Sequence, residues 1–470
     1  MDAIIDFLNE IFWGYVLIYG LIGVGIYFTI RLRFLQFRHF GEFVRSVLRA
    51  PATDAGGITP FQALCTSLAS RVGTGNLAGV AVALYLGGPG ALFWMWVVAL
   101  VGMATAYAES TLAQLYKIRD ENGQFRGGPA FYMARGLRAP WAGSLFSVCL
   151  LVVFGLVFNA VQANSIAEAM EGAFGVPKIG VGIAVAVLTA VVIFGGIRKI
   201  AQVAEYVVPF MAGAYLAVAL YVLVVNIAEV PAMLALIVKS AFGIEAAGGG
   251  VAGGMAAAML NGVKRGLYSN EAGMGSAPNI AAAATPVPHH PASQGLVQSL
   301  GVFIDTLLIC TATGLVILLS GVLGDGGDGV VITQNALVVF FGPWGSWFAA
   351  IALFFFAFTT ILGNYAYAEN GLLYLGGGDV GLFLLRAAAL AVIVWGVHAQ
   401  VPLVWSAADA AMAMMATLNL AALLGLSGVV VKLTRDYDRQ LDAGRWPVFH
   451  IADYPELGDG VDHEIWRERD

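Results

Sequence analysis

Apolar residues gather into runs of about 20 residues along this chain, and short polar segments separate the runs. An α-helix needs about this length to cross the hydrocarbon core of a bilayer, whereas strands of a membrane barrel have about 10 residues and alternate strictly. The pattern therefore predicts an all-α integral membrane protein with eleven transmembrane helices. The predicted spans lie near 12–31, 58–86, 90–116, 143–168, 178–197, 203–226, 233–264, 293–322, 344–372, 381–397 and 404–432.

Two of these predicted helices are interrupted by glycine. Span 58–86 contains VGTGN at 72–76, and span 233–264 contains GGGVAGG at 248–254. Backbone groups freed inside a membrane must be satisfied by protein or by a wet cavity. Close packing of neighbouring helices explains a single Gly-x-Gly about equally well.

The positions of the two interruptions favour a functional explanation. Without the first span, the other ten form two sets of five, and each set begins with its glycine-broken helix. Because five is odd, the two sets enter the membrane from opposite sides and form a 5+5 inverted repeat. Broken helices at matching positions of inverted repeats are typical of the central site of a transporter.

This organisation predicts four regions and an orientation. Basic segments at 31–49 and 117–138 and basic pairs at 198–199 and 264–265 alternate with acidic or neutral loops. The positive-inside rule then places the N-terminus outside and the C-terminus in the cytoplasm of a plasma membrane, as in a bacterial inner membrane. The regions are an N-terminal peripheral helix with a basic cytoplasmic loop (1–50), a first repeat (51–230), a second repeat (231–433) and a cytoplasmic tail (434–470).

Composition agrees with a membrane protein, since 59% of the 470 residues are hydrophobic and 11% are charged. Soluble domains carry about 25% charged residues. Cys65, Cys149 and Cys310 each lie inside an apolar run without metal or disulfide spacing, so we expect ordinary core positions. We expect a small-molecule substrate and the lipid bilayer as partners, and no nucleic acid. The sequence leaves the oligomeric state open.

A broken helix offers two kinds of binding group. The half that begins after the break presents N–H groups suited to a carboxylate, and the half that ends there presents carbonyls suited to a cation. The surroundings carry no obvious paired charge, which suits a small zwitterion held by backbone. Gln162 shares a helix face with Asn159 and either lines the substrate path or bonds between helices. The predicted substrate-binding residues are Gly73, Thr74, Gly75, Asn76, Gln162, Gly249, Gly250 and Gly253.

Charged residues at depth form a candidate gate. A charge in mid-bilayer costs at least about 2.5–3.5 kcal/mol, so Arg71 must face the protein interior or water with a partner. We hypothesise that Arg71 pairs with Asp305 or with Glu271 and closes the inner path. Residues 269–271 are typical of a helix start, with a capping residue followed by an acid. A fixed loop there is the alternative to a gate.

Several long motifs resemble the alanine or glycine:cation symporter family, the sodium:alanine symporters. They are SLASRVGTGNLAGVAVAL, GGPAFYM, GVKRGLYSNEAGMGSAP and HPASQGLVQSLGVFIDTLLICTATGL, and the similarity runs over residues 10–435. The resemblance implies a leucine-transporter-like fold with one extra N-terminal helix. It also implies Na⁺ as co-transported ion, held by carbonyls of Ala69 and Val72 and hydroxyls of Thr359 and Thr360. By itself a Thr-Thr pair is weak, since threonine often bonds to its own helix.

The resulting prediction is sodium-coupled symport of a small neutral amino acid, alanine or glycine, into the cell by alternating access. The alternative is a proton-coupled or uncoupled carrier, with Asp305 as a proton site. We expect neither a channel nor an intramembrane enzyme. A channel would not need inverted repeats, and an enzyme would need a nucleophile with a base, or metal ligands, deep in the membrane. Substrate size, L or D preference and Na⁺ stoichiometry stay open.

Overall fold

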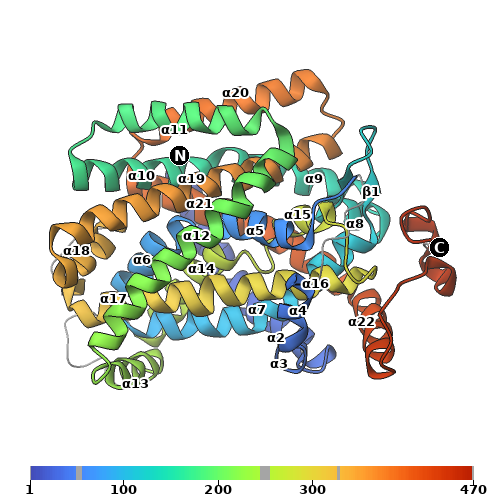
Figure 1. The fold of residues 1–470 in the computed structure, drawn as a ribbon, viewed down its shortest axis with the longest axis horizontal. Coiled ribbons are helices and arrows are strands. Elements are labelled where there is room, and N and C mark those ends of the chain that lie inside the picture. The colour runs from blue at the N-terminus through green and yellow to red at the C-terminus, as the bar shows by residue number, and fades with distance from the viewer. Residues whose placement is uncertain (1, 49–55, 244–253, 325–328, 468–470) are drawn as a thin grey trace.

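The computed structural model describes residues 2–48, 56–243, 254–324 and 329–467, which fold almost entirely as α-helices (Figure 1). Eight helical stretches in these residues are long and apolar enough to cross a membrane. They are Ile5–Arg31, within α1 (Asp2–Ile11), η1 (Phe12–Leu17) and α2 (Ile18–Arg31); Gly90–Leu115 (α7); Pro140–Phe174, made of α9 (Pro140–Leu150), η3 (Leu151–Val157) and α10 (Phe158–Phe174); Gly196–Val225 (α12); Pro291–Ser320, made of α16 (Pro291–Val302), η4 (Phe303–Cys310) and α17 (Thr311–Ser320); Pro343–Tyr374 (α19); Asp379–Gly396 (α20); and Val404–Gly425, within α21 (Val401–Gly425).

Shorter elements complete the described chain. They are α3 (Leu35–Arg38), α4 (Phe40–Leu48), α5 (Pro60–Arg71), η2 (Gly75–Gly79), α6 (Val80–Gly87), β1 (Ile118–Arg119), β2 (Phe125–Arg126), α8 (Pro129–Arg135), α11 (Lys178–Ile193), α13 (Val230–Ala241), α14 (Met255–Asn270), α15 (Pro278–Ala283), η5 (Val322–Gly324), α18 (Val330–Phe341), α22 (Ser427–Asp442), η6 (Ile451–Asp453) and η7 (Pro455–Gly460). The two strands form a small antiparallel hairpin.

The first interrupted helix has the break that its sequence predicts. A capping box starts α5, because the Thr59 and Gln62 side chains each accept from the other residue's backbone N–H, and Pro60 suits the first turn. The helix ends after Arg71, since Val72 leaves the helical region with ψ 85°. A π-helical turn from Gly75 then leads into α6.

The second interruption lies at residues 271–277, between α14 and α15. Glu271, Gly273 and Gly275 all have positive φ, and Pro278 starts α15. The prediction that residues 269–271 begin a helix is wrong: they end α14, because Glu271 adopts the left-handed conformation that terminates a helix. The predicted glycine break at 248–254 concerns Gly249, Gly250 and Gly253, which lie outside the described residues.

The two interrupted helices lie side by side. Helix α6 packs along α14 and α5 packs against α15, where Ile58 N donates to Ala283 O (3.1 Å) and Thr285 N to Ile58 O (2.9 Å). In Figure 1, the halves α6 and α14 lie to the left and the halves α5 and α15 lie to the right. Lys264 and Arg265 therefore lie on the α6 side of the breaks, opposite Lys117. The sequence prediction that grouped these basic residues on one side is wrong, because the pair belongs to α14 and not to a loop.

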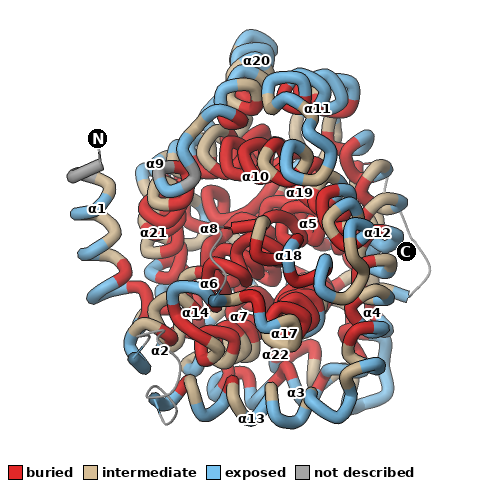
Figure 2. The backbone as a smooth tube through the Cα atoms, turned by 90° about the vertical axis from the view of Figure 1, so that its left-hand side faces the viewer, coloured by how far each residue is buried: buried red, intermediate tan, exposed pale blue. Residues whose placement is uncertain are grey.

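Other helices enclose this central pair. Helices α7 and α16 are packed together and mostly buried, whereas α11 and α20 lie at the periphery with one exposed side (Figure 2). The interior includes many polar groups as well as apolar ones, and the largest buried side chains include Arg71 and Lys117. In a membrane protein, buried polar groups of this kind mark functional positions.

The C-terminal tail packs against the loop that joins α15 to α16. Trp466 is fully buried, and its Nε1 donates to Leu115 O (3.2 Å). Phe449 N donates to His289 O (2.9 Å), and Ile451 N to Trp466 O (3.2 Å). The tail therefore holds the end of α7 and the 284–290 loop together.

His290 makes the stability of this junction depend on pH. Burial lowers the pKa of His290 although Asp436, 3.3 Å away, opposes the shift. A histidine whose pKa is lower in the folded state is protonated more easily after unfolding. The free energy of unfolding is therefore highest above the unfolded pKa of about 6.5 and decreases as the pH falls below that value. We expect the unfolding temperature to drop between pH 7.5 and 5.5, and to drop less in His290→Asn, which retains a helix-capping side chain.

The control is His398→Asn, since His398 is exposed and remote from the tail. A fall in His290→Asn equal to that of the wild type would contradict this assignment.

Candidate functional site

A threonine hydroxyl lies against the carbonyl end of α5. Thr360 Oγ1 of α19 is 2.8 Å from Ala69 O and 3.4 Å from Val72 O. Both carbonyls are freed where α5 stops. Gly73 is required here, because a Cβ at this position would come within 2.3 Å of Thr360 Oγ1. The structure thus brings together three of the four residues that the sequence predicts for the cation.

The fourth residue, Thr359, bonds along its own helix. Its Oγ1 lies 3.0 Å from both Phe355 O and Phe356 O, and Thr360 Oγ1 also lies 3.0 Å from Phe356 O. Phe356 O therefore belongs to the same cluster of oxygens. The sequence gives no signal for this member, because it is a backbone carbonyl and not a side chain. Several neutral oxygens around one point are the ligands of a hard cation such as Na⁺.

The amides of the first break are held by side chains. Gly73 N donates to Asn76 Oδ1 (3.0 Å) and Thr74 N donates to Gln162 Oε1 (3.1 Å). Gln162 Nε2 in turn donates to the hydroxyl of Tyr268 (3.2 Å). Gln162 thus faces the break, whereas its neighbour Asn159 accepts from Asn364 Nδ2 and bonds between helices. The sequence missed Tyr268, which lies at the end of α14.

Gly75 allows α14 to approach the break. A Cβ on Gly75 would lie 3.1 Å from the Tyr268 ring and 3.2 Å from Ser269 Cα. The Thr74 hydroxyl lies 3.2 Å from the Tyr268 hydroxyl. All these side chains are buried, and the polar groups of the break are bonded to one another.

A buried carboxylate closes the other side of the break. Asp305 accepts from Asn76 Nδ2 (2.7 Å), from Ser269 Oγ (2.5 Å) and from Thr306 Oγ1 (2.7 Å). Asn76 therefore links the first break to Asp305 on the π-helical turn η4 (Phe303–Cys310). Three donors stabilise this carboxylate away from water.

Glu271 joins the two breaks directly. It accepts from Ser70 Oγ (2.8 Å), at the end of α5, and from Ser276 Oγ (2.5 Å) within its own loop. Ser70 Oγ also lies 2.9 Å from Asn364 Oδ1 of α19. Glu271, for which the sequence left a gate or a fixed loop open, thus lies where both helices are interrupted.

Arg71 is buried beside these acids, and its Nη1 donates one hydrogen bond to Gln298 O (3.3 Å). Its Nε and Nη2 have no hydrogen-bond partner among the described residues. The side-chain amide of Gln298 and the Oε2 atom of Glu109 also have none there. Among the described residues, Arg71 forms no ion pair with Glu271 or with Asp305. Buried groups of this kind are typically bridged by water.

A layer of rings separates the break from a cavity on the α6 side. The ring of Tyr268 packs between Phe158 (centroids 4.8 Å) and Trp405 (4.9 Å), and the guanidinium of Arg265 lies 4.6 Å from the Trp405 centroid. Arg265 Nη2 is 2.7 Å from Asp409 Oδ2. Beyond the layer lies a cavity of about 440 Å³, also lined by Lys264.

Comparisons with known proteins agree on one family. The profile of the sodium:alanine symporter family matches residues 1–451. The chain is 47% identical to the probable sodium/glutamine symporter GlnT of Bacillus subtilis, over 96% of this chain and 93% of that protein. It is 41% identical to the sodium/alanine symporter AgcS of Methanococcus maripaludis, over 93% and 97% of the two chains.

A solved structure shares the fold. The crystal structure of MhsT in complex with L-phenylalanine superposes with a TM-score of 0.52 at 13% identity, covering 81% of this chain and 99% of that one. The expected leucine-transporter-like architecture is thereby confirmed in outline. At this identity the likeness concerns the fold alone.

The oxygen cluster around Thr360 predicts stabilisation by Na⁺. We expect NaCl to raise the unfolding temperature of the purified protein relative to choline chloride. Thr360→Ala removes a ligand that touches both half-helix carbonyls, so the Na⁺ titration midpoint should rise about tenfold, which corresponds to about 1.4 kcal/mol. Thr359→Ala should have a smaller effect.

Thr417→Ala is the matched control, because the Thr417 hydroxyl bonds only within its own helix, to Ala413 O (2.8 Å). Equal Na⁺ titrations of the Thr360 and Thr417 variants would argue against a cation at this cluster.

Proposed function

The chain belongs to the sodium:alanine symporter family, and from this premise we propose that it carries one small neutral amino acid together with Na⁺ by alternating access. The supporting observation is the meeting of two interrupted helices, where Ser70 bonds Glu271 and Thr360 lies on the carbonyls of Ala69 and Val72. Members of this family are transporters and not enzymes.

We place Na⁺ among Ala69 O, Val72 O, Phe356 O and the hydroxyls of Thr360 and Thr359. All five oxygens belong to α5 and α19, so a bound ion would tie these helices together. The binding of Na⁺ would thereby favour the arrangement of α5 in which the adjacent break is formed. Such a difference in affinity between two states is what couples an ion to a conformational change.

The substrate would replace the internal bonds of the break. Gly73, Thr74, Gly75 and Asn76 supply amides and a half-helix N-terminus for the carboxylate. Gln162 and the Tyr268 hydroxyl offer polar groups for the ammonium end, together with carbonyls of the loop 271–277. Close packing at Gly73 and Gly75 leaves little room, which favours a small side chain such as that of alanine or glycine.

The halves of the chain fit an inverted repeat of five membrane-crossing elements each. The first comprises α5 with α6, α7, α9 with α10, α11 and α12. The second comprises α14 with α15, α16 with α17, α19, α20 and α21. The second break then lies at 271–277, and α13 and α18 do not count as crossings. With the first helical stretch this makes eleven crossings, the N-terminus outside and the C-terminus in the cytoplasm.

Two barriers follow from this orientation. On the outer side, the rings of Tyr268 and Trp405 with the Arg265–Asp409 ion pair cover the break below the 440 Å³ cavity. On the inner side, the hydrogen bond between Ser70 and Glu271 joins the two interrupted helices, and the Arg71 side chain lies between them and α16. Incompletely bonded groups around Arg71 would admit water when α5 and α15 separate.

Uptake into proteoliposomes tests the function. We expect an inward Na⁺ gradient to drive accumulation of labelled alanine, and a K⁺ gradient of the same size to drive none. One charge crossing about 100 mV releases about 2.3 kcal/mol, enough for roughly fifty-fold accumulation. Competition by a panel of L- and D-amino acids then measures the specificity. Alanine equilibration that ignores the Na⁺ gradient would indicate an uncoupled carrier.

Asp305 separates sodium coupling from proton coupling. Asp305→Asn keeps the size of the side chain but removes its exchangeable proton. We expect a pH gradient alone to drive no uptake in the wild type. Accumulation driven by a pH gradient in the wild type and lost in Asp305→Asn would instead support the proton-coupled alternative.

A further inference from the structure

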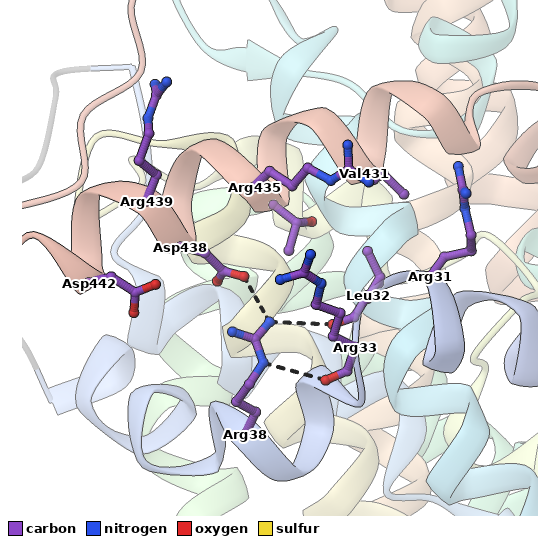
Figure 3. A pocket seen from close by; sticks show the side chains of 10 residues that line it. Arg31, Leu32, Arg33, Arg38, Val431, Arg435, Asp438, Arg439 and Asp442 are labelled. Atoms are coloured by element: carbon purple, nitrogen blue, oxygen red, sulfur yellow. Dashed lines mark hydrogen bonds and ion pairs between the residues drawn. The ribbon is translucent and has the colours of Figure 1, made fainter.

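A group of arginines gathers at the end of the first membrane stretch, away from the transport site. Arg31, Arg33 and Arg38 come from the end of α2 and from α3, and Arg435 and Arg439 come from α22. Together they line a cavity of about 340 Å³ with Asp438 and Asp442 (Figure 3). Its size is within the range of about 300–1,000 Å³ that is typical of small-molecule sites.

Two carboxylates beside these arginines, Asp438 and Asp436, are already engaged. Asp438 lies 2.8 Å from Arg38 Nη2 and 2.7 Å from His39 Nε2, and although burial opposes it, these bonds lower the pKa of Asp438. Asp436 is bonded by Arg439 and lies 3.3 Å from His290. Within the described part of the chain, Arg31, Arg33 and Arg435 have no carboxylate within ion-pair distance.

The backbone that presents Arg33 is strained. Arg33 and Phe34 have φ of 56° and 55°, a left-handed conformation that side chains other than glycine rarely adopt. Arg38 holds this turn, because its Nη2 lies 3.4 Å from Leu32 O and its Nε 3.4 Å from Arg33 O (Figure 3). Strain that neighbouring groups maintain is typical of functional positions.

The surroundings indicate that the cavity lies at the membrane surface. Arg31 ends the apolar stretch Ile5–Arg31. Phe34 and Phe37, which follow it, are 54% and 63% exposed, and Phe40 at the start of α4 is exposed as well. Exposed aromatic rings beside arginines at the end of a membrane helix are typical of the interface between hydrocarbon and headgroups.

We propose that this cavity binds the phosphate of an anionic phospholipid headgroup, held by Arg31, Arg33 and Arg435, with the lipid chains lying beside Phe34 and Phe37. Arginine suits this ligand because its planar guanidinium can donate two hydrogen bonds to one phosphate. Basic clusters directly beyond a membrane helix attract anionic lipids electrostatically. A bound lipid would bridge α2 and α22.

A second cavity beside the first extends the basic surface. It measures about 410 Å³ and shares Arg31, Arg435 and Arg439 with the first while adding Lys432. Lys432 is paired with Glu456 of the tail, so it contributes less free charge. The headgroup site therefore centres on the arginines between α2 and α22.

Thermal unfolding of the full-length protein in neutral detergent tests the proposal. We expect added phosphatidylglycerol to raise the unfolding temperature more than phosphatidylcholine does. In Arg33→Gln/Arg435→Gln the midpoint of the phosphatidylglycerol titration should rise about tenfold, which equals about 1.4 kcal/mol. Lys199→Gln/Arg445→Gln loses the same charge at exposed positions outside the cavity and should titrate like the wild type.

Further arms identify the ligand. Arg33→Lys/Arg435→Lys keeps the charge without the planar fork and should bind with intermediate strength. Free glycerol 3-phosphate at the same concentration should leave the unfolding temperature unchanged. A response to glycerol 3-phosphate equal to that of the lipid would assign the cavity to a soluble phosphate and overturn the proposal. Equal titrations of the Arg33→Gln/Arg435→Gln and Lys199→Gln/Arg445→Gln variants would overturn it too.

Discussion

Backbone groups freed inside a membrane must find partners within the protein, and the rest of this structure depends on that constraint. At the first break, Gly73 N–H is bonded by Asn76, Thr74 N–H by Gln162, and the carbonyls of Ala69 and Val72 face Thr360. Each partner comes from the break itself or from a different helix. The function that we propose uses these same groups, because they would bind ligands of matching charge once their internal bonds are released.

The second break brings acids to the same place. Glu271 bonds Ser70 and Asp305 bonds Asn76, so the first interrupted helix is bonded to two acids from elsewhere in the chain. Arg71 lies among these acids, and two of its three nitrogens have no hydrogen-bond partner in the part of the chain that the structure describes. Such an arrangement couples the two interrupted helices, since displacement of α5 would break the bond between Ser70 and Glu271. The tail and the arginine cavity lie beyond this centre, against the ends of α7 and α2.

Much of the fold followed from the sequence. The long apolar runs predicted a helical membrane protein, and the profile of the sodium:alanine symporter family confirms the resemblance that the motifs carried. The break at 72–76 was visible because glycine, threonine and asparagine replace apolar residues there. Of the predicted break at 248–254, residues 248–253 lie outside the part of the chain that the structure describes, and the interruption at 271–277 was not predicted. The helix-start interpretation of residues 269–271 was wrong because it relied on residue types that also end helices, and only the backbone shows that Glu271 has positive φ.

By itself, the sequence determined the class of protein, the family and the position of one helix break, because hydrophobic length and local glycine content act within a single helix. Only the tertiary structure decided which groups meet there. Phe356 O and Tyr268 join the site through packing between helices, and Lys264 and Arg265 prove to lie on the far side of the breaks from Lys117. Contacts between residues distant in sequence depend on how helices pack in three dimensions, and no local pattern records that.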